Sequence, residues 1–320
     1  MFASDQAAQP RIDGGSAAAA APHTGTGWRP SQAAGRPAYL LVEPSHYDVS
    51  YAINPWMQPG LWAEDPALHR AEAGRAFEAL CQALREAGGV PEVADGAAGL
   101  PDMVFPANGA VVLDGRALLA RFRYPQRQGE EAAFERVFAR LQAQGVVREV
   151  AHLPGGCLQE GAGDCLWDRT RRLAWTGFGP RSTPDSPDVL ADHFGIEIRR
   201  LELATPRFYH LDTCFCALPR GEVLFYPPAF TEAGLRLIHE AVEPDQRLEA
   251  SDEDAAAFCV NAVALGEKVV MANPPDRLRA RLAERGYEVL GVDLAPFILS
   301  GGGAYCMTLR LDLVTNPGAA

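Results

Sequence analysis

Apolar runs and helix-like segments alternate along most of this chain. Four times, two apolar runs flank a turn, near residues 114, 170, 220 and 266. The paired runs are 103–113 with 117–122, 165–167 with 173–175, 214–218 with 223–226, and 258–265 with 268–271. Segments with helical spacing follow at about 130–144, 187–194, 230–242 and 275–286, each succeeded by a short apolar segment. Such a recurrence predicts a repeat of ββαβ units that closes, with the terminal pieces, into a ring of about five, and an ordinary α/β sandwich is the alternative.

The chain begins differently from these repeats. Residues 1–36 are rich in Ala, Gly, Pro and Ser, which predicts a disordered tail. The apolar run 38–42 predicts a buried strand, and residues 65–88 have the apolar spacing of a helix. Between them, residues 46–57 form a predicted loop rich in aromatic side chains. We expect this loop to cover either a hydrophobic edge or a ligand pocket, and we expect a single α/β domain over residues 37–316.

The amino-acid composition argues against some classes of binding partner and favours one cellular compartment. The chain has 320 residues, a net charge of -12 and a pI of about 5.1, which argues against a nucleic-acid partner. Its seven cysteines are scattered, so neither a disulfide framework nor a zinc site is expected, although Cys214 and Cys216 are predicted to share one face of a strand. We therefore predict a reducing, cytoplasmic setting. The sequence shows no signal peptide and no apolar stretch long enough to span a bilayer, so no membrane partner is expected.

One cysteine follows directly on a run of glycines. Gly301, Gly302 and Gly303 precede Cys306, and an apolar, strand-like stretch comes after it. Glycine lets the backbone approach a ligand closely. A thiol placed there can act as a nucleophile if its pKa is lowered or if a base takes its proton. A buried structural cysteine is the alternative, because free cysteines are often buried.

Other segments carry groups that could complete such a site. His210 lies just before a predicted strand, and Glu160 and Asp164 bracket small residues just before another. A histidine can move protons, and a carboxylate can orient it or face a cationic ligand. Asp102 and Asn108 are expected at the two ends of one strand. The candidate clamps for a carboxylate are Arg121, Arg123, Arg127 and Arg181. Taken singly, each of these residues fits a purely structural interpretation better.

In combination, these segments resemble the guanidine-modifying enzymes. That superfamily includes arginine deiminases, dimethylarginine dimethylaminohydrolases, amidinotransferases and arginine dihydrolases. The resemblance rests on residues 47–49, 53–57, 102–105, 160–164, 208–213 and 306, in that order. It covers about residues 38–313, and it implies the pentein fold, a five-bladed α/β propeller. This fold agrees with the repeat pattern.

The resemblance also implies a role for each candidate residue. Cys306 resembles the nucleophile that attacks the guanidinium carbon, and His210 resembles the general acid and base. Glu160 matches the carboxylate that binds guanidinium nitrogens and orients the histidine, and Asp212 matches a second guanidinium ligand. The other substrate-binding positions are Arg127 and Arg181 for an α-carboxylate, Asp102 and Asn54 for the amino end, and Ser300 beside the glycine run, with Arg121 and Arg123 as rivals of Arg127. A covalent cysteine mechanism of this kind requires no metal and no organic cofactor.

Asn108 departs from one pattern of the superfamily. Deiminases and dimethylaminohydrolases grip the guanidinium with an aspartate there, whereas the asparagine is similar to cyanobacterial arginine dihydrolases and to succinylarginine dihydrolase. An amide both donates and accepts hydrogen bonds, so it can hold a neutral ureido group as well as a cation. We therefore predict that arginine is converted to ornithine, carbon dioxide and two ammonia.

Several alternatives stay open. The same scaffold could stop at citrulline, releasing dimethylamine or one ammonia. An amidinotransferase would pass the amidino group to an acceptor amine. A non-catalytic binding protein of this fold is disfavoured, because it has no reason to keep Cys306, His210 and Glu160 together. In each enzymatic case the expected partner is a small guanidino compound, and the superfamily makes a homo-oligomer a further possibility.

Overall fold

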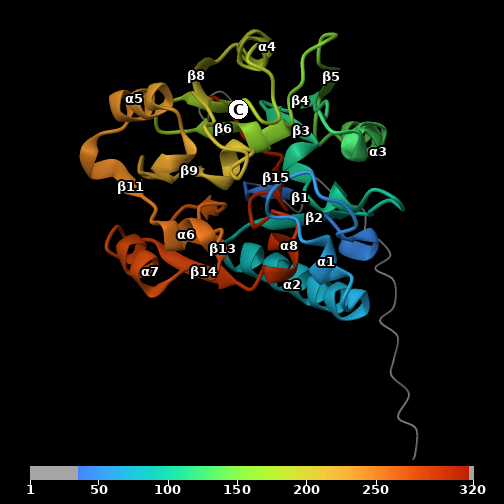
Figure 1. Ribbon diagram of the computed structural model, residues 1–320. Helices are drawn as coiled ribbons and strands as arrows, with labels where there is room; N and C mark the ends of the chain where they lie inside the picture. Colours follow the sequence, from blue (N-terminus) through green and yellow to red (C-terminus); the bar gives the residue numbers. More distant parts are fainter. Residues whose placement is uncertain (1–34, 317–320) are drawn as a thin grey trace, which may run out of the picture.

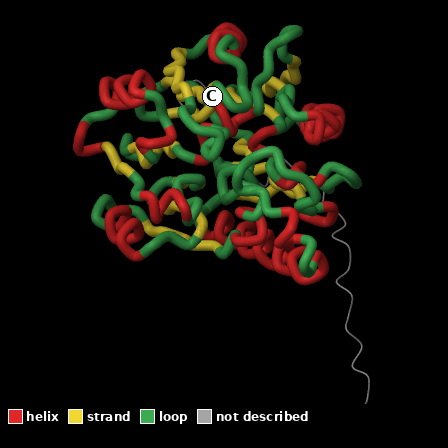
Figure 2. Tube along the Cα trace, viewed as in Figure 1, coloured by secondary structure: helices red, strands yellow, loops and turns green. Residues whose placement is uncertain are grey.

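The computed structural model describes residues 35–316, and they form a mixed α/β structure (Figure 1). The tail predicted over residues 1–36 falls, except for its last two residues, outside the described part. Five three-stranded sheets contain all the strands of the described residues. Figure 2 shows the strands lying inward of the longer helices, which are distributed around the periphery.

Four of the sheets repeat one connection. In each, the first two strands pair antiparallel and the second and third pair parallel. The sheets are β3 (Ala110–Leu113), β4 (Arg116–Leu119) and β5 (Glu149–His152); β6 (Cys165–Asp168), β7 (Leu173–Phe178) and β8 (Glu197–Glu202); β9 (Phe215–Ala217), β10 (Val223–Phe225) and β11 (Arg247–Glu249); and β12 (Val263–Leu265), β13 (Lys268–Ala272) and β14 (Glu288–Val292). The hairpin turns fall where the sequence predicts them, so the ββαβ repeat is confirmed.

The fifth sheet joins the two ends of the described chain. β1 (Ala38–Val42) pairs parallel with β2 (Val90–Ala94) and antiparallel with β15 (Leu309–Arg310). β15 therefore occupies the place that β3, β6, β9 and β12 hold in their own sheets. We call these five the first strands. The terminal segments thus complete a fifth unit, as the repeat pattern predicts.

A helix crosses between the second and third strands of each sheet, because a parallel pair cannot be joined by a tight turn. These helices are α2 (Pro66–Glu86), α3 (Pro125–Ala143), α4 (Ser186–Phe194), α5 (Glu232–Ala241) and α7 (Asp276–Ala283). The shorter elements are α1 (Pro59–Trp62), α6 (Asp252–Ala256), α8 (Ala295–Ile298) and the 3-10 turns η2 (Pro44–His46), η3 (Pro101–Val104), η4 (Pro106–Asn108), η5 (Gly161–Asp164), η6 (Leu211–Thr213), η7 (Pro227–Ala229) and η8 (Pro244–Gln246). The five predicted helices are confirmed, with α3 beginning five residues earlier than expected.

The longest helix, α2, shows how local sequence sets these boundaries. The side chain of Asp65 accepts a hydrogen bond from the backbone N–H of Leu68, and Pro66 takes the first helical position, where no N–H donor is needed. Its apolar residues recur at helical spacing and are buried on one face. Gly88 ends the helical region with a φ of 96°, a backbone conformation that other residues rarely adopt.

One strand prediction is wrong in a way that matters for the site. The apolar run 103–113 predicts a long strand, but only its last part forms β3. Pro101 and Pro106 lack the N–H that a central strand needs, and they begin η3 and η4 instead. Asp102 and Asn108 therefore lie in two successive turns rather than at the two ends of a strand.

The pairing of two cysteines on one strand face is also wrong. Cys214 ends η6 before β9 begins, and its side chain packs with Leu211 and Phe215. Cys216 lies within β9 and packs in a different apolar cluster, with Leu224 and Leu248. All seven cysteines lie among the described residues, and all are free thiols.

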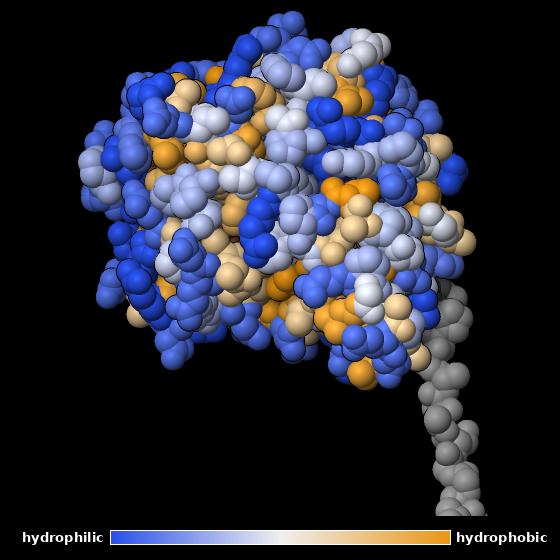
Figure 3. Space-filling view, in the orientation of Figure 1, coloured by the Kyte–Doolittle hydropathy of each residue, from blue (hydrophilic) through white to orange (hydrophobic). Residues whose placement is uncertain are grey.

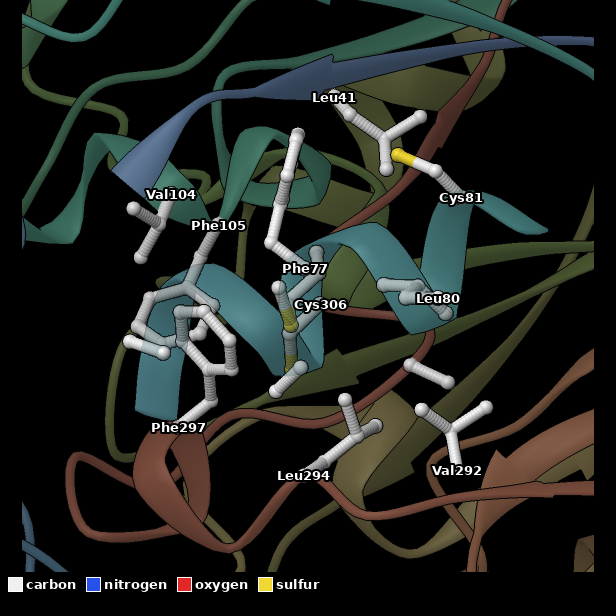
Figure 4. Close-up of a cluster of buried hydrophobic side chains, with 14 of the residues drawn as sticks. Leu41, Phe77, Leu80, Cys81, Val104, Phe105, Val292, Leu294, Phe297 and Cys306 are labelled. Atoms are coloured by element: carbon white, nitrogen blue, oxygen red, sulfur yellow. The ribbon is translucent and has the colours of Figure 1, made fainter. Parts of the chain in front are cut away.

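Apolar packing anchors the nucleophile candidate on one side. One buried cluster, shown in Figure 4, includes Leu41, Phe77, Leu80, Cys81, Val104, Phe105, Val292, Leu294, Phe297 and Cys306. α2 and α8 contribute much of it, so these helices support the segment that carries Cys306. On the face drawn in Figure 3, polar side chains dominate the periphery and apolar residues occur in separate patches. Among the described residues, none of the helices is long and apolar enough to span a membrane.

Candidate active site

A short turn precedes the first strand of every sheet, and each turn carries a polar or nucleophilic side chain. Asn108, Asp164 and Asp212 lie in η4, η5 and η6, just before β3, β6 and β9. Asn261 precedes β12 by two residues, and Cys306 precedes β15 by three. Since η4 contacts η5 and η5 contacts η6, the repeat itself gathers these side chains. The candidate site is therefore built from equivalent positions of the five units.

The Cys306 thiol is buried between two polar partners. It donates to Asp212 Oδ2 at 3.1 Å and accepts from Asn261 Nδ2 at 3.1 Å. Burial, together with the nearby charge of Asp212, raises the pKa of Cys306 well above its ordinary value. Burial also raises the pKa of Asp212 to about 7. In the absence of a cation, this arrangement favours the neutral thiol over the thiolate.

Asn261 holds the nucleophile from several directions. Its amide nitrogen also donates to the backbone carbonyl of Asp212 at 3.0 Å. Its amide oxygen accepts the backbone N–H groups of Tyr305 and Cys306 at 2.9 and 3.2 Å. The side chain is fully buried. One amide therefore fixes both the backbone and the sulfur of Cys306, and links them to Asp212.

His210 is oriented by a buried carboxylate. Its Nε2 lies 2.8 Å from Glu160 Oε2, and Arg181 Nη1 donates to the same oxygen at 2.9 Å. The other oxygen of Glu160 accepts the backbone N–H of Arg123 at 3.0 Å. Burial alone would raise the pKa of Glu160, but Arg181 and His210 outweigh it and hold the pKa below its ordinary value. Glu160 is therefore ionised at neutral pH and keeps the imidazole in place.

A second buried arginine fixes the amide of Asn108. Arg127 Nη1 donates to Asn108 Oδ1 at 2.9 Å, and the same guanidinium binds both oxygens of Glu130 at 2.8 Å each. The amide nitrogen of Asn108 then faces the other way, 3.3 Å from the Glu160 carbonyl oxygen and 3.4 Å from His210 Nδ1. Burial raises the pKa of Glu130 to about 7, although Arg127 lowers it. Asn108 thus presents its donor group beside the histidine.

The aromatic loop at residues 46–57 closes over these groups. Tyr51 donates its hydroxyl to Asp102 Oδ2 at 2.9 Å, and Arg181 Nη2 donates to the Ile53 carbonyl at 3.2 Å. Cys306 and the catalytic candidates beneath the loop are almost fully buried. The loop therefore lies against the site and contacts two of its binding candidates, Asp102 and Arg181.

Further contacts of this loop reach the glycine run and the segment before His210. Asn54 Nδ2 donates to the Ser300 carbonyl at 3.0 Å, and the Ser300 hydroxyl lies 2.7 Å from the Tyr47 hydroxyl. Trp56 donates its indole N–H to the Arg207 carbonyl at 2.7 Å, and the Arg207 guanidinium carbon lies 3.9 Å from the Trp56 ring centroid. Both ends of the loop are thus attached to segments that carry site residues.

Two carboxylate oxygens in the site are left for a ligand. Within residues 35–316, neither Asp102 Oδ1 nor Asp212 Oδ1 has a hydrogen-bond partner, and both atoms are buried. Burial raises the pKa of Asp102 as well as that of Asp212. A buried carboxylate oxygen without a donor is costly, and a cation with N–H groups would relieve that cost. The site is therefore suited to a ligand that carries positively charged nitrogens.

Small residues permit the close packing of the turns. A Cβ on Gly163 would overlap the amide nitrogen of Asn108, and one on Gly302 would overlap the ring of Phe105. Gly301 has a φ of 87°, in the region that glycine tolerates. The glycines that precede Cys306 in the sequence thus serve both the turn and the contacts around it.

Comparison with known proteins identifies the family. A family model described as N,N dimethylarginine dimethylhydrolase, eukaryotic, matches residues 48–313. The chain belongs to this family. It is 34% identical to the N(G),N(G)-dimethylarginine dimethylaminohydrolase of Mycobacterium tuberculosis over 85% of this chain and 85% of that protein.

Two bifunctional relatives are more similar in sequence than this dimethylargininase. The bifunctional arginine dihydrolase/ornithine cyclodeaminase AgrE of Nostoc sp. is 40% identical over 87% of this chain, which spans only 38% of AgrE. A crystal structure of the N-terminal domain of ArgZ, an arginine dihydrolase from cyanobacteria, was determined for a cysteine-to-serine mutant bound to substrate. It matches 88% of this chain and all of that domain with a TM-score of 0.82 and 37% identity. The chain therefore spans less than half the length of AgrE, and it shares the fold of the N-terminal domain of ArgZ.

The structure brings the predicted site residues together. The catalytic candidates Cys306, His210 and Glu160 and the binding candidates Asn54, Asp102, Asn108, Arg127, Arg181, Asp212 and Ser300 all lie in the contact network described above. Of the three rival arginines, Arg127 alone places its guanidinium beside Asn108. The Arg121 side chain donates to backbone carbonyls of residues 153, 154 and 157, and that of Arg123 donates to the Arg181 carbonyl.

The sequence patterns did not mark Asn261, Glu130 or Tyr51 as site residues. Asn261 could have been found by aligning the repeats, because it stands two residues before its first strand, as Asn108 does. Glu130 lies in the first turns of α3, three residues after Arg127, which is a spacing for helical ion pairs. No group of three or more potential metal ligands occurs among residues 35–316.

Proposed function

We propose that this chain is a hydrolase that acts on the guanidino group of arginine through a covalent intermediate on Cys306. The products are ornithine, carbon dioxide and two ammonia, and two waters are consumed. The observation that carries this proposal is the orientation of Asn108, whose amide nitrogen points toward His210 while Arg127 holds its oxygen. The similarity to the arginine dihydrolase portions of AgrE and ArgZ supports it.

The first step uses the substrate's own charge. A guanidinium that donates to Asp212 and Glu160 lowers the cost of ionising Cys306, because it places a positive charge where the site has two carboxylates. The thiolate attacks the guanidinium carbon, and ammonia leaves with a proton from His210. The amidino carbon is then bonded to sulfur. His210 removes a proton from water, water adds to that carbon, and the C–S bond breaks to leave citrulline and the thiol.

The second step requires the site to hold a neutral ureido group. The amide nitrogen of Asn108 can donate to the ureido oxygen, which an aspartate in the same place cannot do when it is ionised. A second attack by Cys306 releases the second ammonia or the ornithine amine, and water completes the hydrolysis to ornithine and carbon dioxide. Asn108 is therefore the residue that distinguishes two rounds of hydrolysis from one.

The α-amino and α-carboxylate groups of the substrate contact a set of buried charged side chains. Arg127 and Arg181 supply positive charge for the α-carboxylate, and Asp102, whose Oδ1 is unpartnered within the described residues, accepts from the α-amino group. Asn54 and Ser300 join the loop 46–57 to the floor of the site. In this structure Glu130 and Glu160 hold the two arginines, so the substrate carboxylate adds to existing pairs.

Five broader assignments accompany this function. The five sheets are blades of a five-bladed α/β propeller, a pentein fold, in which β15 closes the ring with β1. Residues 37–316 act as a single catalytic domain. The free thiols support a cytoplasmic setting. A small guanidino substrate is its partner, with no role for nucleic acid or membrane, and self-association into a homo-oligomer is tested by light scattering.

Product analysis tests the proposal. The full chain is incubated with arginine, and ornithine and citrulline are quantified by mass spectrometry, with Cys306→Ser as the control. Ornithine that accumulates with two ammonia per arginine, and that disappears in the control, is the expected result. Citrulline as the final product would overturn the dihydrolase assignment. The variant Asn108→Asp is expected to release citrulline, because its carboxylate favours the cation over the ureido group.

Two other functions of the same site give different products. A dimethylargininase would release dimethylamine from dimethylarginine faster than it would hydrolyse arginine, and the membership of the chain in that family favours this candidate next. An amidinotransferase would consume arginine only when an acceptor amine is added. Both assays use the same protein and the same Cys306→Ser control.

A further inference from the structure

Asp164 is a buried carboxylate that takes no part in the mechanism proposed above. It lies in η5 just before β6, the position that Asn108 and Asp212 hold in the neighbouring units. Those two side chains contact the catalytic candidates directly. Asp164 instead binds donors of the surrounding protein. Its Oδ1 accepts the backbone N–H of Leu211 at 2.9 Å, and its Oδ2 accepts from the Ser182 hydroxyl at 2.6 Å.

The peptide group that joins His210 to Leu211 is held from both sides. Its N–H donates to Asp164, and its carbonyl accepts from the hydroxyl of Thr213 at 2.6 Å. A Cβ on Gly177 would lie 2.8 Å from Asp164 Oδ1 and 2.8 Å from Leu211 Cβ, so the absence of a side chain there permits this contact. The direction in which the backbone presents the His210 side chain thus depends on Asp164.

The second oxygen of Asp164 is connected to the carboxylate partner of His210. The Ser182 hydroxyl that donates to Asp164 also accepts from the backbone N–H of Glu160 at 3.1 Å. Burial raises the pKa of Asp164 to about 6, so its side chain is ionised at neutral pH and both oxygens accept hydrogen bonds. One carboxylate therefore joins the backbone of Glu160 to the backbone that follows His210.

We propose that Asp164 is a positioning residue, which holds His210 and Glu160 in the relative arrangement that lets the imidazole give its proton to the leaving ammonia. This inference rests on the proposed function, and only on its first step, in which Cys306 attacks the amidino carbon. Nitrogen cannot leave that carbon readily without taking up a proton, so a displaced imidazole slows the step.

The test compares two substrates that differ only in the leaving group. Arginine loses ammonia, which needs a proton from His210. S-Methyl-L-thiocitrulline carries a methylthio group on the same carbon, and its C–S bond breaks to release methanethiolate, which takes the electron pair and needs no proton from the protein. Both substrates leave the same amidino group on Cys306. Single-turnover loss of each substrate, with the full chain in excess, therefore isolates the leaving-group step.

The variant Asp164→Asn should affect the two substrates differently. We expect it to slow the loss of arginine about ten- to a hundredfold and that of S-methyl-L-thiocitrulline less than about threefold. The reason is that an amide has one acceptor oxygen in place of two, so either the Leu211 N–H or the Ser182 hydroxyl loses its acceptor. A role confined to stability would not change the ratio of the two rates.

Asp168→Asn is the matched control. Asp168 is also a buried carboxylate, at the end of β6, but it binds Arg171 and the indole N–H of Trp175 instead. Its variant should keep the wild-type ratio of the two rates, even if it unfolds more easily.

A second variant keeps the inference testable if Asp164→Asn folds poorly. Ser182→Ala removes the hydroxyl that joins Asp164 to the Glu160 backbone, and it leaves the contact with Leu211 in place. The loss of arginine should be about tenfold slower, with the loss of S-methyl-L-thiocitrulline again within about threefold. Equal slowing of both substrates in either variant, or no slowing of arginine, would overturn the assignment.

Failure of the proposed function gives a different result. Citrulline as the final product of arginine overturns the dihydrolase assignment but leaves the two single-turnover rates, and hence the role of Asp164, unaffected. If the wild-type protein consumes neither substrate, or if Cys306→Ser consumes both, the covalent step is overturned and the role of Asp164 with it.

Discussion

The residues around Cys306 keep its thiol protonated until a cation binds. Asp212 accepts from the thiol, and its charge opposes formation of the thiolate. The sulfur anion is stabilised by a backbone hydrogen bond from Gly303 and by the Asn261 amide, 3.1 Å away. We therefore expect the thiolate to form mainly when positively charged nitrogens occupy the site, which would protect the thiol from other electrophiles.

Replacing Asp212 is therefore expected to have opposite effects on reactivity and turnover. In Asp212→Asn, alkylation of Cys306 by iodoacetamide at pH 7.5 should be about tenfold faster or more, since each unit of lowered thiol pKa gives tenfold more thiolate. Hydrolysis of arginine should fall about ten- to a hundredfold, because one charged hydrogen bond to the guanidinium is lost. The two rates are measured on the same preparations. Parallel losses of both would show that the variant merely disturbs the site.

Asn261 has the opposite role to Asp212. In Asn261→Asp the oxygen that accepts the two backbone N–H groups remains, but the donor to the Cys306 sulfur is replaced by a negative charge. We expect the pH midpoint of Cys306 alkylation to rise by about one unit or more, and kcat to fall while the far-ultraviolet circular dichroism is preserved. Asn316→Asp, on the exposed surface, is the matched control. An unchanged midpoint would remove Asn261 from the nucleophile's environment.

At the scale of elements, the loop 46–57 connects access to binding. Its contacts reach Asp102, Arg181, Ser300 and Arg207, so the same movement that admits a substrate releases side chains from the substrate-binding set. We expect closure over a bound substrate to restore these contacts and to exclude water. The loop is thus part of the binding site as well as its cover.

The stacking of Arg207 on Trp56 should contribute to closure without touching the chemistry. Arg207→Ala removes a cation–π contact worth about 0.5–1 kcal/mol, so the loop should open about two- to fivefold more often. Hydrogen exchange of the backbone N–H groups at 51–57 should accelerate by that factor, and KM for arginine should rise while kcat is retained. Arg199→Ala, which breaks a surface pair with Glu197 instead, serves as the control. Equal exchange in the two variants would contradict a closing role for Arg207.

The sequence predicts elements better than it predicts the turns between them. Helices such as α2 can be predicted from their apolar spacing, their caps and their terminal glycines, and hairpins can be predicted from their turn residues. The apolar run 103–113 gives a wrong strand prediction because a buried 3-10 turn and a buried strand have the same apolar residues. The prolines at 101 and 106 argue against a strand there. The catalytic residues were predicted from a family resemblance, whereas Asn261 lies in a repeat that the resemblance did not mark.

At the scale of the whole molecule, the site concentrates buried acids that the fold tolerates for function. Burial raises the pKa of Asp212 to about 7, that of Glu130 to about 7 and that of Asp164 to about 6. Glu160 is shifted in the other direction by its arginine and histidine partners. Near neutral pH, the free energy of unfolding is therefore reduced by the ionisation of Asp212, Glu130 and Asp164 and increased by that of Glu160.

The contribution of Asp212 can be isolated by its pH dependence. Its folded-state pKa of about 7 exceeds the ordinary value of 3.8, so the folded state binds the proton more tightly than the unfolded state. The resulting stabilisation is complete below about pH 4 and is lost as the pH rises through about 7. The side chain of Asp212→Asn cannot titrate. The free energy of unfolding of this variant should therefore rise relative to that of the wild type between pH 4 and pH 8, by at most about 4 kcal/mol.

Urea unfolding of both proteins at several values of pH measures this difference directly. Asp245→Asn, a change at an exposed carboxylate, controls for the loss of one charge from an acidic protein. A difference between wild type and Asp212→Asn that stays constant from pH 4 to pH 8 would mean that Asp212 is as well solvated in the folded state as in the unfolded chain. A difference that grows with pH would show that the fold gives up stability to keep a carboxylate ready for the cation that activates Cys306.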